Sequence, residues 1–170
     1  LIENLVNEFS DFARMPKPIF SNNNIIEVIN NNITLLKQID LSILIKLKCN
    51  FSSLFFKFDN EQITRVILNL IKNSIESIKE KSIKNPNFTK IINIEIINKS
   101  DYIAINIIDN GTGFSKENIK KIIKPYFTTK PKGSGLGLSI VNKIINDHNG
   151  SIKFNSTEDG AKVNITLPKN

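Results

Sequence analysis

The chain has 170 residues, enough for one domain and a short additional segment. Its 40% hydrophobic and 23% charged residues are typical of a globular protein and argue against disorder, and it contains no run of about 18 apolar residues that would predict a membrane span. The net charge of +7 comes from lysines scattered along the sequence, without the dense basic run of a nucleic-acid-binding surface.

The first part of the chain predicts two helices and a strand. Apolar residues at helical spacing over 1–13, followed by two prolines, indicate a helix that needs a partner, as in a coil or bundle. A second helix is expected within 23–39. Residues 42–51 then alternate like a half-buried strand. This strand includes Cys49, the one cysteine, which excludes an internal disulfide and fits a small core residue in a reducing compartment.

The rest of the chain mixes helices with paired strands. Asp59 is a suitable N-cap for a long helix over 60–81. The other expected elements are a hairpin over 90–98 and 102–109, a short helix over 116–123, a helix over 136–148, and a closing hairpin over 150–156 and 161–168. This order predicts an α/β sandwich with one mixed, mainly antiparallel sheet and helices on one face.

Two asparagines, Asn69 and Asn73, lie four residues apart on one face of the long predicted helix. Asparagine is a poor residue for a helix interior, and these two stand among isoleucine, leucine and valine. Their amide oxygens are the kind of ligand that Mg²⁺ prefers. A polar edge of the helix that faces solvent is the alternative interpretation.

A second motif, IIDNGTGF, places Asp109 at the end of a predicted strand and Gly111 and Gly113 just after it. A carboxylate at this place can accept a hydrogen bond from an exocyclic amine such as that of adenine, and the glycines allow backbone to lie flat against a ring. Taken alone, the motif is equally typical of a tight turn.

A third motif, KPYFTTKPKGSGLGLSIV, has glycine at positions 133, 135 and 137, at the start of the last predicted helix. Lys130 and Lys132 stand just before the glycines. Glycine-rich backbone beside positive charge at a helix N-terminus is suited to binding phosphate, although a flexible loop is an alternative. The spacing matches neither G-x-x-x-x-G-K-[ST] nor G-x-G-x-x-G.

The three motifs together resemble the ATP-binding catalytic domain of bacterial sensor histidine kinases. This Bergerat-type fold is shared with gyrase, the heat-shock-90 chaperones and the MutL repair proteins. The resemblance covers about residues 22–168. Residues 1–18 are similar to the C-terminal end of the dimerisation and phosphotransfer hairpin in nitrogen-regulation-type kinases, so we expect the catalytic domain to occupy 19–170.

The resemblance implies a role for each motif. Asn73 would bind the Mg²⁺ that bridges the ATP phosphates, with Asn69 assisting, and Asp109 would accept a hydrogen bond from the adenine amine. The segment from about 115 to 132 would be a mobile lid, in which Lys130 neutralises phosphate charge. Asn69, Asn73 and Lys130 are the implied catalytic residues. The other implied nucleotide-binding residues are Gly111, Gly113, Phe127, Thr128, Thr129, Gly133, Ser134, Gly135, Leu136, Gly137 and Leu138.

The implied reaction is transfer of the ATP γ-phosphate to a histidine, for relay to a response regulator, by a homodimeric cytoplasmic domain of a bacterial inner-membrane sensor. Asn69 stands where relatives that hydrolyse ATP carry glutamate. Its amide cannot take a proton at neutral pH, which favours transfer over hydrolysis. The one histidine, His148, lies at the end of the last predicted helix. We therefore expect a structural role for His148 and a phosphoacceptor outside this chain.

Two positions depart from the family pattern. Many relatives carry a basic and an aromatic residue where this chain has Glu76 and Ser77. The resemblance therefore does not extend to phosphate contact from that side of the helix. A serine kinase or ATPase of the same fold, and a non-catalytic nucleotide-binding adapter, remain alternatives.

Overall fold

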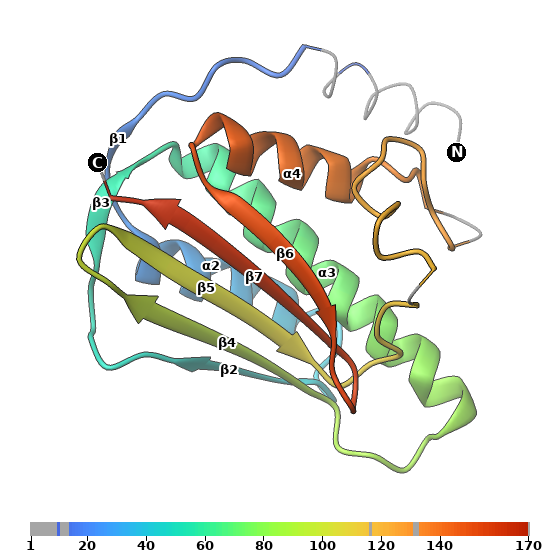
Figure 1. The fold of residues 1–170 in the computed structure, drawn as a ribbon. Helices are drawn as coiled ribbons and strands as arrows, with labels where there is room; N and C mark the ends of the chain where they lie inside the picture. The colour runs from blue at the N-terminus through green and yellow to red at the C-terminus, as the bar shows by residue number, and fades with distance from the viewer. Residues whose placement is uncertain (1–9, 11–13, 116, 131–132, 170) are drawn as a thin grey trace.

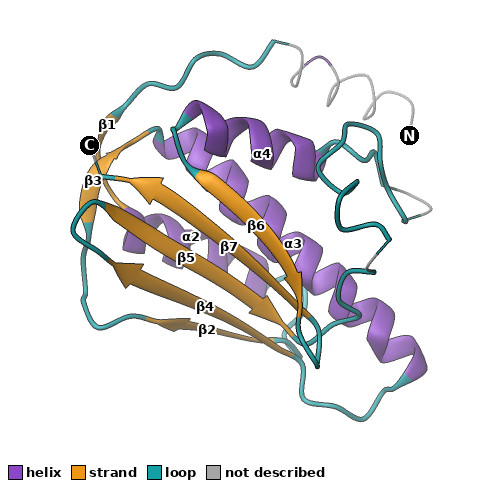
Figure 2. Ribbon diagram, in the orientation of Figure 1, coloured by secondary structure: helices purple, strands orange, loops and turns teal. Residues whose placement is uncertain are grey.

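The central feature of the fold is a five-stranded sheet with helices over one of its faces (Figure 1). A computed structural model describes residues 10, 14–115, 117–130 and 133–169. Figure 2 shows the two layers, with the strands in front of the helices α2 (Ile25–Lys37), α3 (Asn60–Lys84) and α4 (Gly137–Asp147). The described parts of the segment between the end of β5 (Tyr102–Asp109) and the start of α4 run beside α3, outside both layers.

The sheet has the strand order β2-β4-β5-β7-β6. β2 pairs with β4 in parallel, and every other neighbouring pair is antiparallel. Isoleucines alternate along the central strands, so that one face is apolar; Ile94 of β4 pairs with Ile107 of β5. The strands span Leu44–Lys48 (β2), Ile91–Asn98 (β4), Tyr102–Asp109 (β5), Ser151–Ser156 (β6) and Ala161–Pro168 (β7).

The helices bury their apolar faces against this sheet. The Asp59 carboxylate caps α3 by accepting a hydrogen bond from the Gln62 N–H at 3.0 Å, and Asn24 caps α2 in the same way. The helices span Ile25–Lys37 (α2), Asn60–Lys84 (α3) and Gly137–Asp147 (α4). The core side of α3 is formed by Ile63, Val66, Ile67, Leu70, Ile71 and Ile78.

Two parts of the structure differ from the sequence prediction. Ser21–Asn24 (β1) and Phe55–Phe58 (β3) form a small antiparallel sheet that the sequence did not predict. The prediction of a helix over 116–123 is wrong for the described residues, because 117–123 form turns. Their hydrogen bonds are isolated; for example, the Ile119 N–H donates to the Ser115 carbonyl.

The predicted fold class is confirmed, since one mixed and mainly antiparallel main sheet carries helices on one face. The helix expected over 1–13 falls almost wholly outside the described residues, so that helix and the domain boundary at 18 stay predictions. Within the described part of the chain, no helix combines the length and apolar character needed to cross a membrane.

Candidate functional site

A cavity of about 430 Å³ lies between α3, the end of β5, the segment that follows β5, and the start of α4. Its size is within the range of small-molecule sites. It has two ends with different chemistry. One end contains Asp109 with Thr112 and Gly113, and the other contains Asn69, Asn73 and Lys130.

The first end is built around the Asp109 carboxylate, which β5 delivers to the cavity at its last residue. Oδ1 accepts a hydrogen bond from the Gly111 N–H at 2.9 Å, and Oδ2 accepts one from the Ser74 hydroxyl at 2.8 Å. Burial raises the pKa of Asp109 above its ordinary value of 3.8, and the bonds from Gly111 and Ser74 oppose that rise. A fixed, buried acceptor of this kind is suited to reading an amine on a flat ring.

Ser77 ties the turn after Asp109 to α3. Its Oγ accepts a hydrogen bond from the Thr112 N–H at 2.9 Å and lies 3.1 Å from the Thr112 hydroxyl. Gly111 packs directly on Ser77, where a Cβ would overlap the serine side chain. Gly113 has φ +74, and a Cβ there would lie 2.7 Å from the Gly160 carbonyl oxygen. The close approach of this turn to its surroundings therefore requires glycine at both positions.

At the second end, amide and charged groups from α3 and the following segment converge. The Lys130 ammonium donates to Asn73 Oδ1 at 3.2 Å and forms an ion pair with the Glu76 carboxylate. The Lys130 N–H also donates to the Thr128 hydroxyl at 3.0 Å. A cation thus already rests against the Asn73 amide oxygen. The oxygen atoms here are of the type that magnesium binds, which fits the predicted metal site.

Asn69 and the start of α4 complete this end of the cavity. The Asn69 side-chain NH₂ donates to the Arg65 carbonyl at 2.9 Å, so its Oδ1 remains on the cavity side. A Cβ on Gly137 would lie 3.2 Å from that oxygen. α4 begins at Gly137, and no side chain caps it with a hydrogen bond. Its first N–H groups are therefore suited to an anionic ligand.

The structure brings almost all the predicted site residues to one cavity. Thirteen of them line it: Asn69, Asn73, Asp109, Gly113, Phe127, Thr128, Thr129, Lys130, Gly133, Ser134, Gly135, Gly137 and Leu138. Gly111 and Leu136 do not line it, because Gly111 is buried against Ser77 and Leu136 lies fully in the core.

Sequence reasoning missed several lining residues, among them Ser74. Ser74 occupies a buried position on the apolar face of α3, between Ile71 and Ile78. A hydroxyl at a core-facing helix position is a detectable signal, since it needs a buried partner. That partner is Asp109. The contacts of Thr112 and Glu80 with the cavity depend on the folded arrangement and carry no such signal.

His148 lies outside the lining of this cavity, at the end of α4. Its side chain is buried, and its Nε2 accepts a hydrogen bond from the Asp59 N–H at 3.1 Å. Nδ1 lies 2.8 Å from the Ile144 carbonyl oxygen and donates to it, which assigns the neutral tautomer. These contacts join the end of α4 to the start of α3, as expected for a structural histidine.

This fold and this cavity define the class of protein: an ATP-binding domain of the Bergerat type. Residues 58–170 match the family described as histidine kinase-, DNA gyrase B-, and HSP90-like ATPase, and the chain belongs to that family. The family predicted from the motifs is thereby confirmed.

Two curated relatives carry the name NtrY or NtrY-like. The chain is 37% identical over 162 residues to an NtrY-like sensor histidine kinase of Rickettsia bellii, covering 95% of this chain and 26% of the relative. It is 33% identical over 168 residues to nitrogen regulation protein NtrY of Azorhizobium caulinodans, covering 98% of this chain and 22% of the relative. The chain therefore spans about a quarter of the length of the curated relatives it matches.

A solved histidine kinase, ThkA, has the same fold. Its nucleotide-free catalytic domain matches with a TM-score of 0.78 at 28% identity, covering 89% of this chain and 98% of that one. ThkA in complex with the response regulator protein TrrA matches with a TM-score of 0.81 at 25% identity, covering 99% of this chain and 47% of that one.

Proposed function

We propose that this chain is the catalytic domain of a two-component sensor histidine kinase and presents the γ-phosphate of Mg²⁺-ATP to a histidine outside these 170 residues. The observation that carries the proposal is the pairing of two chemistries in one cavity. Asp109 supplies a buried acceptor at one end, and Asn73 and Lys130 supply an amide oxygen and a cation at the other. The family match and the sensor-kinase relatives support it.

Asp109 accepts a hydrogen bond from the adenine amine. The bonds from Ser74 and Gly111 hold its carboxylate in place, so little side-chain entropy is lost when the base binds. Gly113 brings backbone close to the plane of the ring, and Phe127 and Leu138 contribute apolar surface to the same cavity.

Asn73 binds magnesium through its amide oxygen, with Asn69 one turn earlier on the same face of α3. Magnesium, when bound, neutralises charge on the phosphates and holds them for transfer. No group of three or more His, Cys, Asp or Glu residues suited to a metal occurs among the described residues. Lys130, Thr128, Thr129 and the N–H groups at the start of α4 contact the phosphates.

Transfer, rather than hydrolysis, follows from the chemistry of Asn69. A side-chain amide cannot accept a proton from water at neutral pH, so this position lacks a general base. His148 is buried and hydrogen-bonded at both ring nitrogens, so it does not serve as the phosphoacceptor. The acceptor histidine, dimerisation, the response regulator and attachment to a bacterial inner membrane belong to the longer protein, in which this domain faces the cytoplasm.

The test is calorimetric titration with ADP and with a non-hydrolysable ATP analogue, with and without Mg²⁺. We expect Asp109→Asn to weaken binding about 10- to 150-fold, the loss of a charge-assisted hydrogen bond of about 1.5–3 kcal/mol. Asp101→Asn, the same charge change at an exposed turn, is the matched control and should bind normally. Folded wild-type protein that binds no nucleotide would refute the proposal and favour an adapter.

A further inference from the structure

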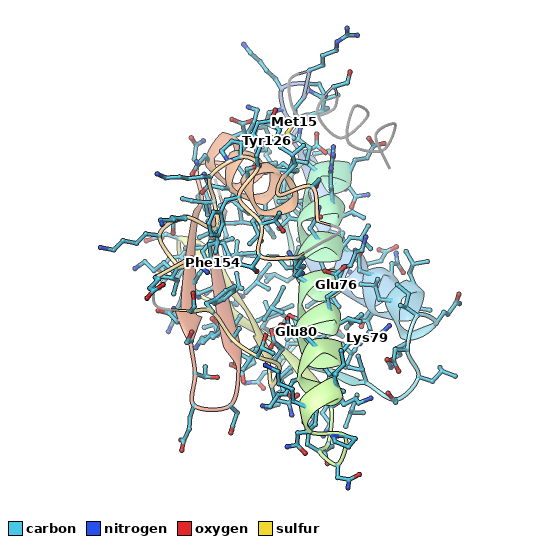
Figure 3. All side chains as sticks on the ribbon, turned by 90° about the vertical axis from the view of Figure 1, so that its right-hand side faces the viewer. Met15, Glu76, Lys79, Glu80, Tyr126 and Phe154 are labelled. Carbon is cyan, nitrogen blue, oxygen red and sulfur yellow. The ribbon has the colours of Figure 1, made fainter. Side chains whose placement is uncertain are left out.

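The Lys130 ammonium rests between two oxygen groups of α3. Asn73 Oδ1 accepts from it at 3.2 Å, and Glu76, three residues further along the helix, forms the ion pair. Residues three apart on a helix lie on the same face, so their oxygens converge on one point in front of α3. Figure 3 labels Glu76 on α3, one turn before Glu80. The point is occupied by a positive charge.

The formal charges of the described side chains that line the cavity cancel, so these side chains give no net attraction for a polyphosphate. Among the described lining residues, the cations Arg65, Lys72 and Lys130 are balanced by Glu76, Glu80 and Asp109. The side chains of Glu76 and Lys130 are 40% and 38% exposed, so both can change partners without unfolding the helix. Glu76 in particular places a carboxylate next to the amide oxygen that binds magnesium under the proposed function.

We propose that Glu76 is a second protein ligand of the divalent cation, beside Asn73, and that Lys130 holds the cation position when no metal is present. Magnesium is commonly bound by one or two carboxylates together with substrate phosphates and water. Arrival of the metal releases Lys130 from Glu76, and the freed ammonium becomes available to the phosphates. This inference rests on the proposed function, because it assigns a residue to the same nucleotide site.

A different role for Glu76, in which it only orients Lys130, predicts the opposite change in nucleotide affinity in metal-free buffer. If Glu76 only orients Lys130 toward the phosphates, its loss weakens nucleotide binding whether or not a metal is present. If Glu76 binds the metal, its loss weakens binding only with the metal. Without the metal, removal of a negative charge and release of Lys130 strengthen binding. The sign of the change in metal-free buffer therefore separates the two roles.

The experiment compares wild type, Glu76→Gln and Glu80→Gln by calorimetric titration with the non-hydrolysable ATP analogue, in EDTA and in saturating Mg²⁺. For Glu76→Gln we expect affinity to rise about two- to fivefold in EDTA, the effect of one partly exposed charge. In Mg²⁺ we expect it to fall by about tenfold or more, since even indirect partners of a metal change its affinity by that much. Glu80→Gln removes the same charge one turn away and should not weaken binding in Mg²⁺.

A second measurement follows the metal directly. Mn²⁺ is titrated into protein saturated with the same analogue, and free Mn²⁺ is read from its electron paramagnetic resonance signal. Glu76→Gln should raise the Mn²⁺ concentration needed for half-saturation, and Glu80→Gln should not. If Glu76→Gln weakens nucleotide binding equally in EDTA and in Mg²⁺, or changes it in neither, the inference is overturned. Normal nucleotide binding by wild type in the same experiment would leave the proposed function standing. Absence of nucleotide binding by wild type would instead refute the proposed function.

Discussion

Gly135 and Gly137 lie at the start of α4, and substitutions at these two glycines should affect folding and nucleotide binding differently. Gly135 has φ +71, and a Cβ there would lie 2.5 Å from the carbonyl carbon of Tyr126 and 2.8 Å from its Cα and O. These are backbone atoms, so no rotamer change relieves the overlap. A Cβ on Gly137 would meet only the Asn69 side-chain oxygen, at 3.2 Å.

We therefore expect opposite effects on stability from Gly135→Ala and Gly137→Ala. Alanine at a left-handed φ costs about 1–2 kcal/mol, and the loop at 135 must also move away from Tyr126. Gly135→Ala should lower the free energy of unfolding by about that amount and weaken nucleotide binding by about tenfold or more, because the loop is displaced where it faces the cavity. Gly137→Ala replaces a helical glycine, which favours the folded state by up to about 1 kcal/mol.

Gly137→Ala should nevertheless bind nucleotide more weakly, because the Asn69 amide must shift by a few tenths of an ångström. Urea denaturation followed by circular dichroism gives the stabilities, and titration with ADP and the ATP analogue gives the affinities. Wild-type affinity in Gly135→Ala would show that the loop does not contact the phosphates. Wild-type stability in Gly135→Ala would show that the fold does not require the left-handed backbone at this position.

Two further predictions concern buried polar groups. Burial raises the pKa of Asp109, so the contribution of Asp109 to the free energy of unfolding should fall as pH rises from 3.8 through its folded pKa. Nucleotide affinity should fall as pH drops through that same raised pKa. Asp109→Asn should remove both effects in pH-dependent denaturation and calorimetry. His148→Phe should lower the free energy of unfolding by about 1–3 kcal/mol, because it leaves the buried Asp59 N–H without its acceptor, and calorimetry should show unchanged nucleotide affinity. A matching loss of affinity would contradict a purely structural role for His148.

The elements that the sequence predicted well are those whose periodicity is set by the core. The long helix expected over 60–81 is α3, and the hairpins expected at 90–109 and 150–168 are present. In each case, one apolar face is buried against the rest of the fold, so the pattern and the structure share a cause. Element ends shifted by a few residues, as in α3, which continues to Lys84.

The errors lie where tertiary contacts outweigh the local pattern. β1 contains three asparagines, which disfavour strands, and it forms only because it pairs with Phe55–Phe58 across 30 or more residues of sequence. Residues 117–123 have apolar spacing for a helix, but the segment is short. The hydrogen bonds of one or two turns do not offset the cost of helix nucleation, and Pro125 follows closely.

Within the site, the motifs predicted which residues gather at the cavity but not how they pair. Asn73 and Lys130 are 57 positions apart, so their hydrogen bond arises only when the segment after β5 folds back over α3. The bond between Ser74 and Asp109, 35 positions apart, is of the same kind. Sequence spacing identifies groups with suitable chemistry, whereas their partners depend on the packing of separate elements.

The departures at Glu76 and Ser77 illustrate this difference. On the sequence alone, these two positions only indicated that the resemblance does not extend to phosphate contact from this side of the helix. In the structure, each has a specific partner: Glu76 pairs with Lys130, and Ser77 accepts a hydrogen bond from the Thr112 N–H. In this chain the positive charge of Lys130 lies on the segment after β5, and the Glu76 carboxylate faces it from α3. Under the proposed role of Glu76, a divalent metal that replaced the Lys130 ammonium would pair with the Glu76 carboxylate and add positive charge beside a bound polyphosphate.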